Sequence, residues 1–95
     1  MLEDVFKNID DICMFNSKKV LEAFWKCHVS EAHFTSTSGY GYGDIGRDTV
    51  EEVYKTIFKA EDALVRNQFI SGTHALSTAF FGLLRPGDLL LSICG

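Results

Sequence analysis

The last few residues of the chain limit its fold more than any other feature. The run LLLSIC at residues 89–94 is almost continuously apolar, and a strand of that kind is covered on both faces. It follows RPGD at residues 85–88, a turn sequence in which proline fixes one backbone dihedral and glycine supplies the permissive one. Residues 63–70 also resemble a strand, and residues 73–84 are apolar nearly all round, as in a helix covered on several sides. The order strand, helix, strand predicts an α/β fold with parallel strands.

Two strands are too few to bury both faces of a sheet. We therefore expect the chain to be the N-terminal portion of a larger α/β protein, in which further strands complete a mostly parallel sheet. The 95 residues suit one small domain that buries about 60 to 65% of the surface of its unfolded chain. With 46% hydrophobic residues and one proline, the sequence is not that of a disordered or low-complexity segment.

The first half of the chain is predicted to be helical up to a long loop. Asn16 and Ser17 are predicted to cap a helix that runs to about residue 29. The apolar residues just before them belong either to a separate short turn or to the same helix, and the sequence leaves both open. Residues 31–46 lose all periodicity and are rich in glycine, serine, threonine and aromatic residues, which predicts a long loop. Loops of that length in compact proteins usually serve a function.

A second amphipathic helix is predicted after the loop. Asp48 and Glu51 have the spacing of a capping box. Apolar residues then recur at the i, i+3, i+4, i+7 and i+8 positions, which lie on one face of a helix. They are Val50, Val53, Tyr54, Ile57 and Phe58.

Charge and cysteine content exclude several classes of partner. Nine basic residues against thirteen acidic ones give a net charge of -4, and the basic residues form no stripe that could follow a nucleic-acid backbone. Three widely spaced cysteines are typical of reduced thiols in a cytoplasmic protein rather than of a disulfide framework. No basic start followed by an apolar run is present, and no apolar segment reaches about 18 residues, so we expect no signal peptide and no membrane partner. Cys27, His28 and His33 lack the paired short spacings of a zinc site, so we expect no metal.

The junction VRNQFISGTHA at residues 65–75 is the best candidate for a binding site. The first amides of a helix have no internal partner and carry a partial positive charge, and Gly72 lets an anion approach the backbone. The hydroxyls of Ser71 and Thr73 add donors. The same residues also suit a plain N-cap without a ligand, which composition alone favours. His74 either faces a ligand or is packed and hydrogen-bonded within its helix.

Four sequence blocks together point to a family. They are GYGYGDIGRD at residues 39–48, EDALVR at 61–66, SGTHA at 71–75 and LRPGD at 84–88. In this order and spacing they closely resemble the bacterial family of aluminium resistance or methionine gamma-lyase-like proteins, which are pyridoxal-phosphate enzymes with the aspartate-aminotransferase type of fold. The resemblance implies an incomplete fold type I, PLP-dependent transferase-like domain, with an N-terminal helical arm and loop at residues 1–38 and the start of the cofactor-binding large domain at residues 39–95. One departure is Lys59, which stands where the family leads us to expect glycine.

The resemblance also implies a cofactor site at the junction described above. Ser71, Gly72 and Thr73 match the turn that holds the phosphate of pyridoxal 5'-phosphate in the family. His74 follows directly and is a further candidate contact. This assignment agrees with the helix electrostatics of the same residues.

A second part of the implied site lies in the glycine-rich loop. Tyr40, Tyr42 and Arg47 match a segment that, in related enzymes, crosses from a neighbouring subunit to bind the same phosphate. Arginine suits this role because its planar fork donates two hydrogen bonds to one phosphate, but Arg47 is also placed to pair with Asp44 or Asp48. The implied assembly is a homo-oligomer.

The implied activity is that of a carbon-sulfur lyase-like enzyme acting on sulfur amino acids. Pyridoxal phosphate accepts the electrons left when an amino acid loses a proton, which allows a sulfur group to leave. This chemistry needs an imine-forming lysine and an acidic partner for the pyridine nitrogen, and in the family both lie beyond residue 95. None of the six lysines matches that lysine, so we expect no catalytic residue here and no activity of the chain alone. The alternative function is a non-catalytic small α/β module that associates with itself.

Overall fold

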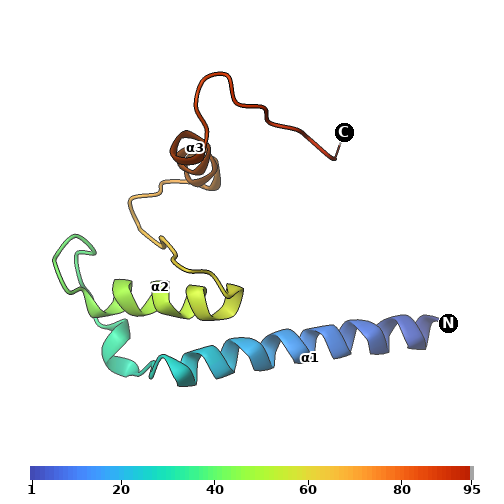
Figure 1. The fold of residues 1–95 in the computed structure, drawn as a ribbon. Coiled ribbons are helices and arrows are strands. Elements are labelled where there is room, and N and C mark those ends of the chain that lie inside the picture. The colour runs from blue at the N-terminus through green and yellow to red at the C-terminus, as the bar shows by residue number, and fades with distance from the viewer. Residues whose placement is uncertain (95) are drawn as a thin grey trace.

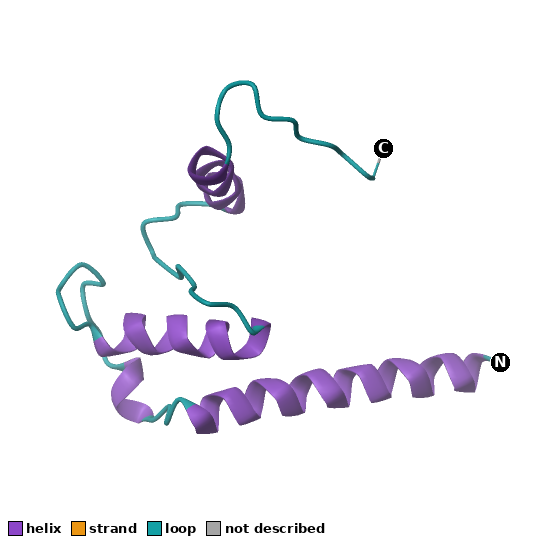
Figure 2. Ribbon diagram, viewed as in Figure 1, coloured by secondary structure: helices purple, strands orange, loops and turns teal. Residues whose placement is uncertain are grey.

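The structure, a computed structural model that describes residues 1–94, is built from helices and connecting segments (Figure 1). In chain order these are α1 (Leu2–Lys26), the 3₁₀ helix η1 (Glu31–Phe34), α2 (Ile45–Phe58) and α3 (Gly72–Leu83). Helix α2 runs back along the C-terminal half of α1, while α3 stands apart at the end of an extended segment. Within residues 1–94 there is no β-strand (Figure 2).

The predicted α/β fold class is therefore wrong, because the described part of the chain is helical and contains no sheet. Residues 63–70 and 89–94, the two predicted strands, are irregular and lie on either side of α3 along the chain. A strand is defined by its hydrogen bonds to a neighbouring strand, and neither run forms a ladder with the other. Apolar composition indicated that both runs need covering. Apolar composition alone does not show whether a neighbouring strand is present for either run to pair with.

Helix α1 begins at Leu2, well before the predicted cap at Asn16 and Ser17, which both lie inside the helix. Apolar residues spaced by three or four positions give the early turns the same amphipathic pattern as the later ones. Glu3 and Asp4 in the first turn complement the positive end of the helix dipole. The residues before Asn16 that the sequence left undecided therefore belong to the same helix.

Helices α1 and α2 both end in a left-handed residue that is not glycine. His28 follows α1 and Lys59 follows α2, and each has a φ of 53°. The next amide in each case donates to a carbonyl of the last helical turn: Val29 to Phe24 at 3.0 Å, and Ala60 to Lys55 at 3.1 Å. This is the Schellman arrangement, in which the left-handed residue turns the chain out of the helix.

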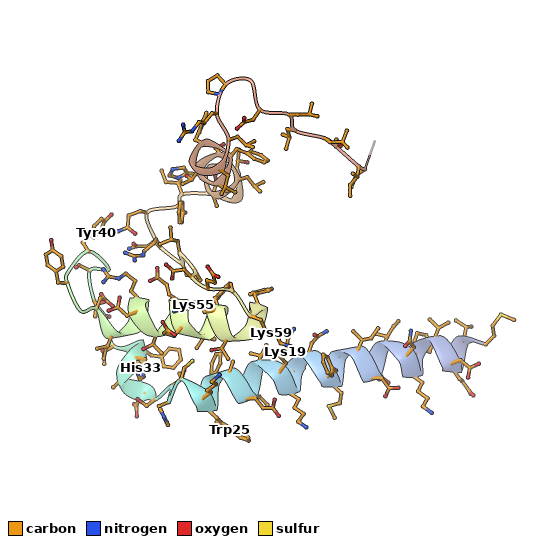
Figure 3. The ribbon with its side chains drawn as sticks, in the orientation of Figure 1. Lys19, Trp25, His33, Tyr40, Lys55 and Lys59 are labelled. Atoms are coloured by element: carbon orange, nitrogen blue, oxygen red, sulfur yellow. The ribbon has the colours of Figure 1, made fainter. Side chains whose placement is uncertain are left out.

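The core of the described structure is small and lies between α1 and α2. Its buried apolar residues are Ala23 of α1 and Val53 of α2, and nearby the Cys27 Sγ and the Thr56 hydroxyl lie 3.7 Å apart. The predicted apolar stripe of α2 faces α1 and η1 and lines an apolar groove with them. Trp25 is 75% exposed and points away from α2 (Figure 3). The N-terminal half of α1 extends beyond α2, and its apolar side chains are exposed.

Helix α2 begins one turn before the predicted capping box. Its N-cap is Asp44, whose carboxylate accepts a hydrogen bond from the Arg47 amide at 3.0 Å, so Asp48 lies in the first turn. The start of the helix also lies close to η1, because a Cβ at Gly46 would be 2.8 Å from the His33 carbonyl oxygen. The contact with η1 therefore requires glycine at position 46.

Helix α3 confirms the helix predicted at residues 73–84 to within one residue at each end. The turn predicted at residues 85–88 is also present, with the Asp88 amide donating to the Arg85 carbonyl at 3.0 Å and Gly87 at a φ of 101°. Within residues 1–94, α3 packs against no other helix. Its apolar side chains, which the sequence predicted to be covered on several sides, are therefore exposed.

The described structure is open rather than closed around a core. Its accessible surface is 8508 Å², whereas a compact protein of this mass exposes about 5,500 Å². Its radius of gyration is 17.9 Å, against about 12 Å for a compact domain of 95 residues. Only about 45% of the unfolded chain's surface is buried, against about 60 to 65% for a stable domain of this size, so about a quarter of the usual covering is missing.

Candidate functional site

The N-terminus of α3 has the geometry of an anion seat. Ser71 is its N-cap in extended backbone conformation, and the Ser71 hydroxyl accepts a hydrogen bond from the His74 amide at 3.2 Å. The amides of Gly72 and Thr73 have no acceptor within residues 1–94. A Cβ built at Gly72 meets nothing within 4 Å, so the approach to these amides is open. The residues present therefore fit a phosphate group, which helix N-termini bind through such amides.

His74 is held by its own surroundings. Its Nδ1 accepts a hydrogen bond from the Ile70 amide at 3.2 Å, and its ring lies edge-on to Phe69 with centroids 5.6 Å apart. Because Nδ1 acts as an acceptor, Nε2 is the ring's remaining donor when the histidine is neutral. His74 is therefore hydrogen-bonded within its own segment through Nδ1 but remains exposed, so the structure does not decide between the two roles that the sequence left open.

The tyrosine loop, residues 39–43, connects η1 to the start of α2. Gly39 and Gly43 have φ values of 74° and 66°, which glycine adopts without strain. Tyr40 is 71% exposed and Tyr42 is fully exposed, so neither ring is packed against the rest of the described chain. Figure 3 shows Tyr40 on this loop at the N-terminal end of α2.

Arg47 spans the loop from the first turn of α2. Its Nη1 donates to the Gly41 carbonyl at 2.9 Å and to the Gly39 carbonyl at 3.3 Å. Its Nε lies 3.0 Å and its Nη2 2.9 Å from one oxygen of Asp48. The pairing of Arg47 with Asp48 that the sequence left open is therefore formed, and the side chain is only 16% exposed.

Asp44 holds the same loop from the other side. Its carboxylate accepts hydrogen bonds from the Gly39 amide at 3.2 Å and from the Arg47 amide at 3.0 Å, and the residue is 8% exposed. These contacts lower the pKa of Asp44 below its ordinary value of 3.8, with the Thr37 hydroxyl as the largest cause, followed by the Arg47 amide. The carboxylate thus stays charged and bound well into the acidic range.

Glu51, one turn after Arg47 on α2, binds the segment at residues 65–66, which leads to α3. Its carboxylate accepts a hydrogen bond from the Val65 amide at 3.2 Å and pairs with both the Nε and the Nη2 of Arg66. The Glu51 hydrogen bond raises the pKa of Arg66 further above its ordinary value. Sequence reasoning missed this pair because its members are fifteen positions apart and only the fold brings them together.

The structure does not bring the two parts of the predicted site together within one chain. The seat at Ser71 to Thr73 begins α3, whereas the tyrosine loop and Arg47 belong to the start of α2, and α2 and α3 do not pack on each other in residues 1–94. No group of three or more metal-binding side chains gathers in the described residues. Across the same residues, no helix combines the length and the apolar character that crossing a membrane requires.

Comparison with known families places the whole chain in one of them. A family model described as methionine gamma-lyase matches residues 1–95. The uncharacterised protein YnbB of Bacillus subtilis (strain 168) is 54% identical over 91 residues, which cover 96% of this chain and 22% of that protein. The resemblance stated from the four sequence blocks is therefore confirmed.

Solved structures agree with the sequence comparison. A carbon-sulfur lyase involved in aluminum resistance from Clostridium novyi NT is 59% identical with a TM-score of 0.82, covering 90% of this chain and 20% of that one. A candidate cystathionine beta-lyase involved in aluminum resistance from Listeria monocytogenes str. 4b F2365 is 57% identical with a TM-score of 0.83, covering 90% of this chain and 22% of that one. The chain thus spans about a fifth of the length of the proteins it matches, as expected of an N-terminal portion.

Proposed function

The chain belongs to the methionine gamma-lyase family, and from this membership we propose that it forms the N-terminal part of a pyridoxal-phosphate-dependent, carbon-sulfur lyase-like enzyme acting on sulfur amino acids. Within that enzyme it binds the cofactor phosphate and contributes no catalytic residue. The descriptions of the solved relatives, carbon-sulfur lyase and candidate cystathionine beta-lyase, support the reaction class. The observation that carries the proposal is the pair of open amides, Gly72 and Thr73, at the start of α3.

Each residue of the seat has a separate task. Ser71 holds the first turn of α3 in place through its bond to the His74 amide. The N–H groups of Gly72 and Thr73, with the Thr73 hydroxyl, bind phosphate oxygens at the positive end of the helix dipole. His74 offers its Nε2–H from the same turn, since Nδ1 is already engaged. When bound here, pyridoxal phosphate supplies an electron sink for the bonds that break in an amino acid.

The tyrosine loop completes the site from a second copy of the chain in a homo-oligomer. Its separation from the seat within one chain supports a contribution in trans rather than in cis. The proposed division into an arm at residues 1–38 and the start of the cofactor-binding domain at 39–95 falls between η1 and α2, where no helix is interrupted. We further propose that the enzyme works in the cytoplasm, where three unpaired cysteines remain reduced.

The substitution Gly72→Pro tests the seat directly. Proline is favoured at the first helical position and Ser71 already has the extended backbone that a residue before proline adopts, so the change removes one N–H while α3 is retained. The variant is made in a full-length enzyme that carries residues 1–95 joined to the remainder of the Bacillus subtilis relative. We expect the affinity for pyridoxal phosphate to fall about tenfold, the equivalent of one lost charge-assisted hydrogen bond.

The matched control is Gly72→Ala, which keeps the N–H and places its Cβ in open space. Its affinity for pyridoxal phosphate is expected to fall less than that of the proline variant, because the N–H is kept. Pyridoxal, which has no phosphate, should bind all three proteins equally. Equal binding of pyridoxal phosphate to the proline and alanine variants would remove the α3 amides from the cofactor site.

A second candidate function, a non-catalytic module that associates with itself, draws on a different observation. The side chains of Leu89, Leu90, Leu91 and Ile93 are exposed in an extended segment. Under this alternative the Gly72 variants would associate like the parent chain, and pyridoxal phosphate would have no effect on any of them.

A further inference from the structure

We propose that Arg47 is a positioning residue, which together with Asp44 clamps the tyrosine loop and so sets where the hydroxyls of Tyr40 and Tyr42 are presented. The clamp itself is independent of any ligand. Its use, to deliver the tyrosines to a cofactor phosphate in another copy of the chain, rests on the proposed function.

The donors of Arg47 are already committed inside its own chain. Three of the five N–H groups of its guanidinium donate hydrogen bonds, two to the carbonyls of Gly39 and Gly41 and one to Asp48. Its Nη2 also lies 2.9 Å from the same Asp48 oxygen, as part of the ion pair. The side chain is mostly buried by these contacts. To bind a phosphate bidentately, Arg47 would first have to release the loop carbonyls or its carboxylate partner, leaving polar groups unpaired.

Gly39 is held at both of its peptide groups. Its amide donates to Asp44 at 3.2 Å, and its carbonyl accepts from Arg47 at 3.3 Å. Its φ of 74° suits glycine, and a Cβ there would lie 2.9 Å from the Asn67 side-chain amide nitrogen, so the loop also leans on the segment that leads to α3. One end of the tyrosine loop is therefore fixed on three sides.

The bond from Arg47 to Gly41 fixes the peptide group between the two tyrosines. Tyr40 and Tyr42 flank this anchored residue, and both rings remain exposed. A backbone held at Gly39 and Gly41 has fewer free torsions, so ordering the tyrosines on a partner surface costs less conformational entropy. Lysine cannot replace arginine in this role, because a compact ammonium does not reach two carbonyls and a carboxylate as a planar fork does.

Limited proteolysis of the full 95-residue chain tests the clamp. Chymotrypsin cuts after both Tyr40 and Tyr42 in the loop and after Leu89 to Leu91 in the extended segment, which has no regular structure and serves as the reference within each digest. We expect the parent loop to be cut about tenfold more slowly than the reference, and Arg47→Ala to bring the two rates together. Arg47→Lys should behave like the alanine variant.

Lys55→Ala is the matched control. Lys55 lies on the same helix and forms an ion pair with Glu52 at 2.6 Å, but it does not touch the loop, so the loop should be cut as slowly as in the parent. If the loop of the parent were cut as fast as the reference segment, the proposed clamp would be overturned. It would also be overturned if the loop of Arg47→Ala were cut as slowly as that of the parent. No cofactor is present in these digests, so their outcome does not depend on the proposed function.

A double-mutant cycle in the joined full-length enzyme tests what the clamp is for. If Arg47 acts through the tyrosines, Arg47→Ala lowers the affinity for pyridoxal phosphate in the parent but adds no loss to the variant carrying Tyr40→Phe and Tyr42→Phe. If Arg47→Ala lowered the affinity for pyridoxal phosphate by the same factor with and without the two tyrosine substitutions, Arg47 would contact the phosphate itself. That result would overturn the positioning role. Unchanged affinity in every variant would overturn the presentation of the tyrosines, while the proteolysis result and the Gly72 test would stand by themselves.

Discussion

At the scale of single residues, the Asp44 side chain joins the tyrosine loop to the start of α2. It caps α2 through the Arg47 amide and holds the tyrosine loop through the Gly39 amide. Both acceptor functions need the carboxylate, and hydrogen bonds to a charged acceptor are stronger than those between neutral groups. The loop and the helix start are therefore coupled to one titrating group.

This coupling predicts a pH dependence of the loop. Because the contacts of Asp44 lower its pKa below 3.8, its contribution to stability is complete above about pH 5 and is lost as the pH falls through the lowered value. The amide resonances of Gly39 and Arg47 should move together with a midpoint below pH 3.8 in an NMR titration. In Asp44→Asn the common transition should be absent. A midpoint at or above 3.8 in the parent would mean that the carboxylate gains nothing from the fold.

Sequence reasoning located the start of α3 but misplaced the cap of α2. Ser71 was predicted at the start of α3, and there the hydroxyl and the first amides need only local geometry. Asp48 was predicted as the cap because it has the capping-box spacing to Glu51, whereas the structure caps α2 with Asp44. The earlier start brings Gly46 into contact with η1, and such contacts between distant residues cannot be read from spacing.

At the scale of elements, a helix was predictable where the apolar periodicity of its own sequence marked it. The amphipathic stripe of α2 and the apolar helix α3 were predicted within a turn of their observed ends. The early part of α1 was left undecided because the caps at Asn16 and Ser17 are plausible in isolation, although an uninterrupted apolar pattern continues through them. The two strands failed because a strand depends on a partner, whereas a helix bonds to itself.

The end of α2 offers a stabilising substitution. Lys59 holds a left-handed conformation that costs a residue with a Cβ about 1 to 2 kcal/mol, and glycine removes most of that cost. We expect Lys59→Gly to stabilise the helical structure by about 0.5 to 1 kcal/mol, measured as a shift of the urea midpoint followed by circular dichroism.

The same substitution at Lys55 serves as its control. Lys55 lies inside the last turn of α2, where glycine lowers helix stability, so Lys55→Gly should move the midpoint in the opposite direction. If both variants moved the midpoint the same way, the left-handed cap would not be the source of strain.

At the scale of the whole molecule, the described residues expose about half as much surface again as a compact protein of their mass. Many of the exposed apolar side chains lie on the N-terminal half of α1, on α3 and in residues 89–93. Exposed apolar area of this extent is typical of surfaces that other protein covers. Sequence reasoning predicted this need for covering from residues 73–84 and 89–94.

The purified chain is therefore predicted to associate with itself. Light scattering coupled to size-exclusion chromatography should give a mass above the 10.6 kDa of one chain, and the dye 1-anilinonaphthalene-8-sulfonate should fluoresce strongly in its presence. The joined full-length enzyme should bind much less dye per residue, because its remaining four-fifths cover the same surfaces. If the chain were monomeric and the dye did not fluoresce, the helices would pack against one another within one chain in solution.

The extended segment at residues 89–94 has a consequence for the order of folding. Its leucines and isoleucine are exposed in the described structure, and no neighbouring element covers them. Chaperones bind polypeptides that expose such segments before folding is complete. We therefore expect the covering of this segment to be a late step, which has to wait until its docking surface has formed.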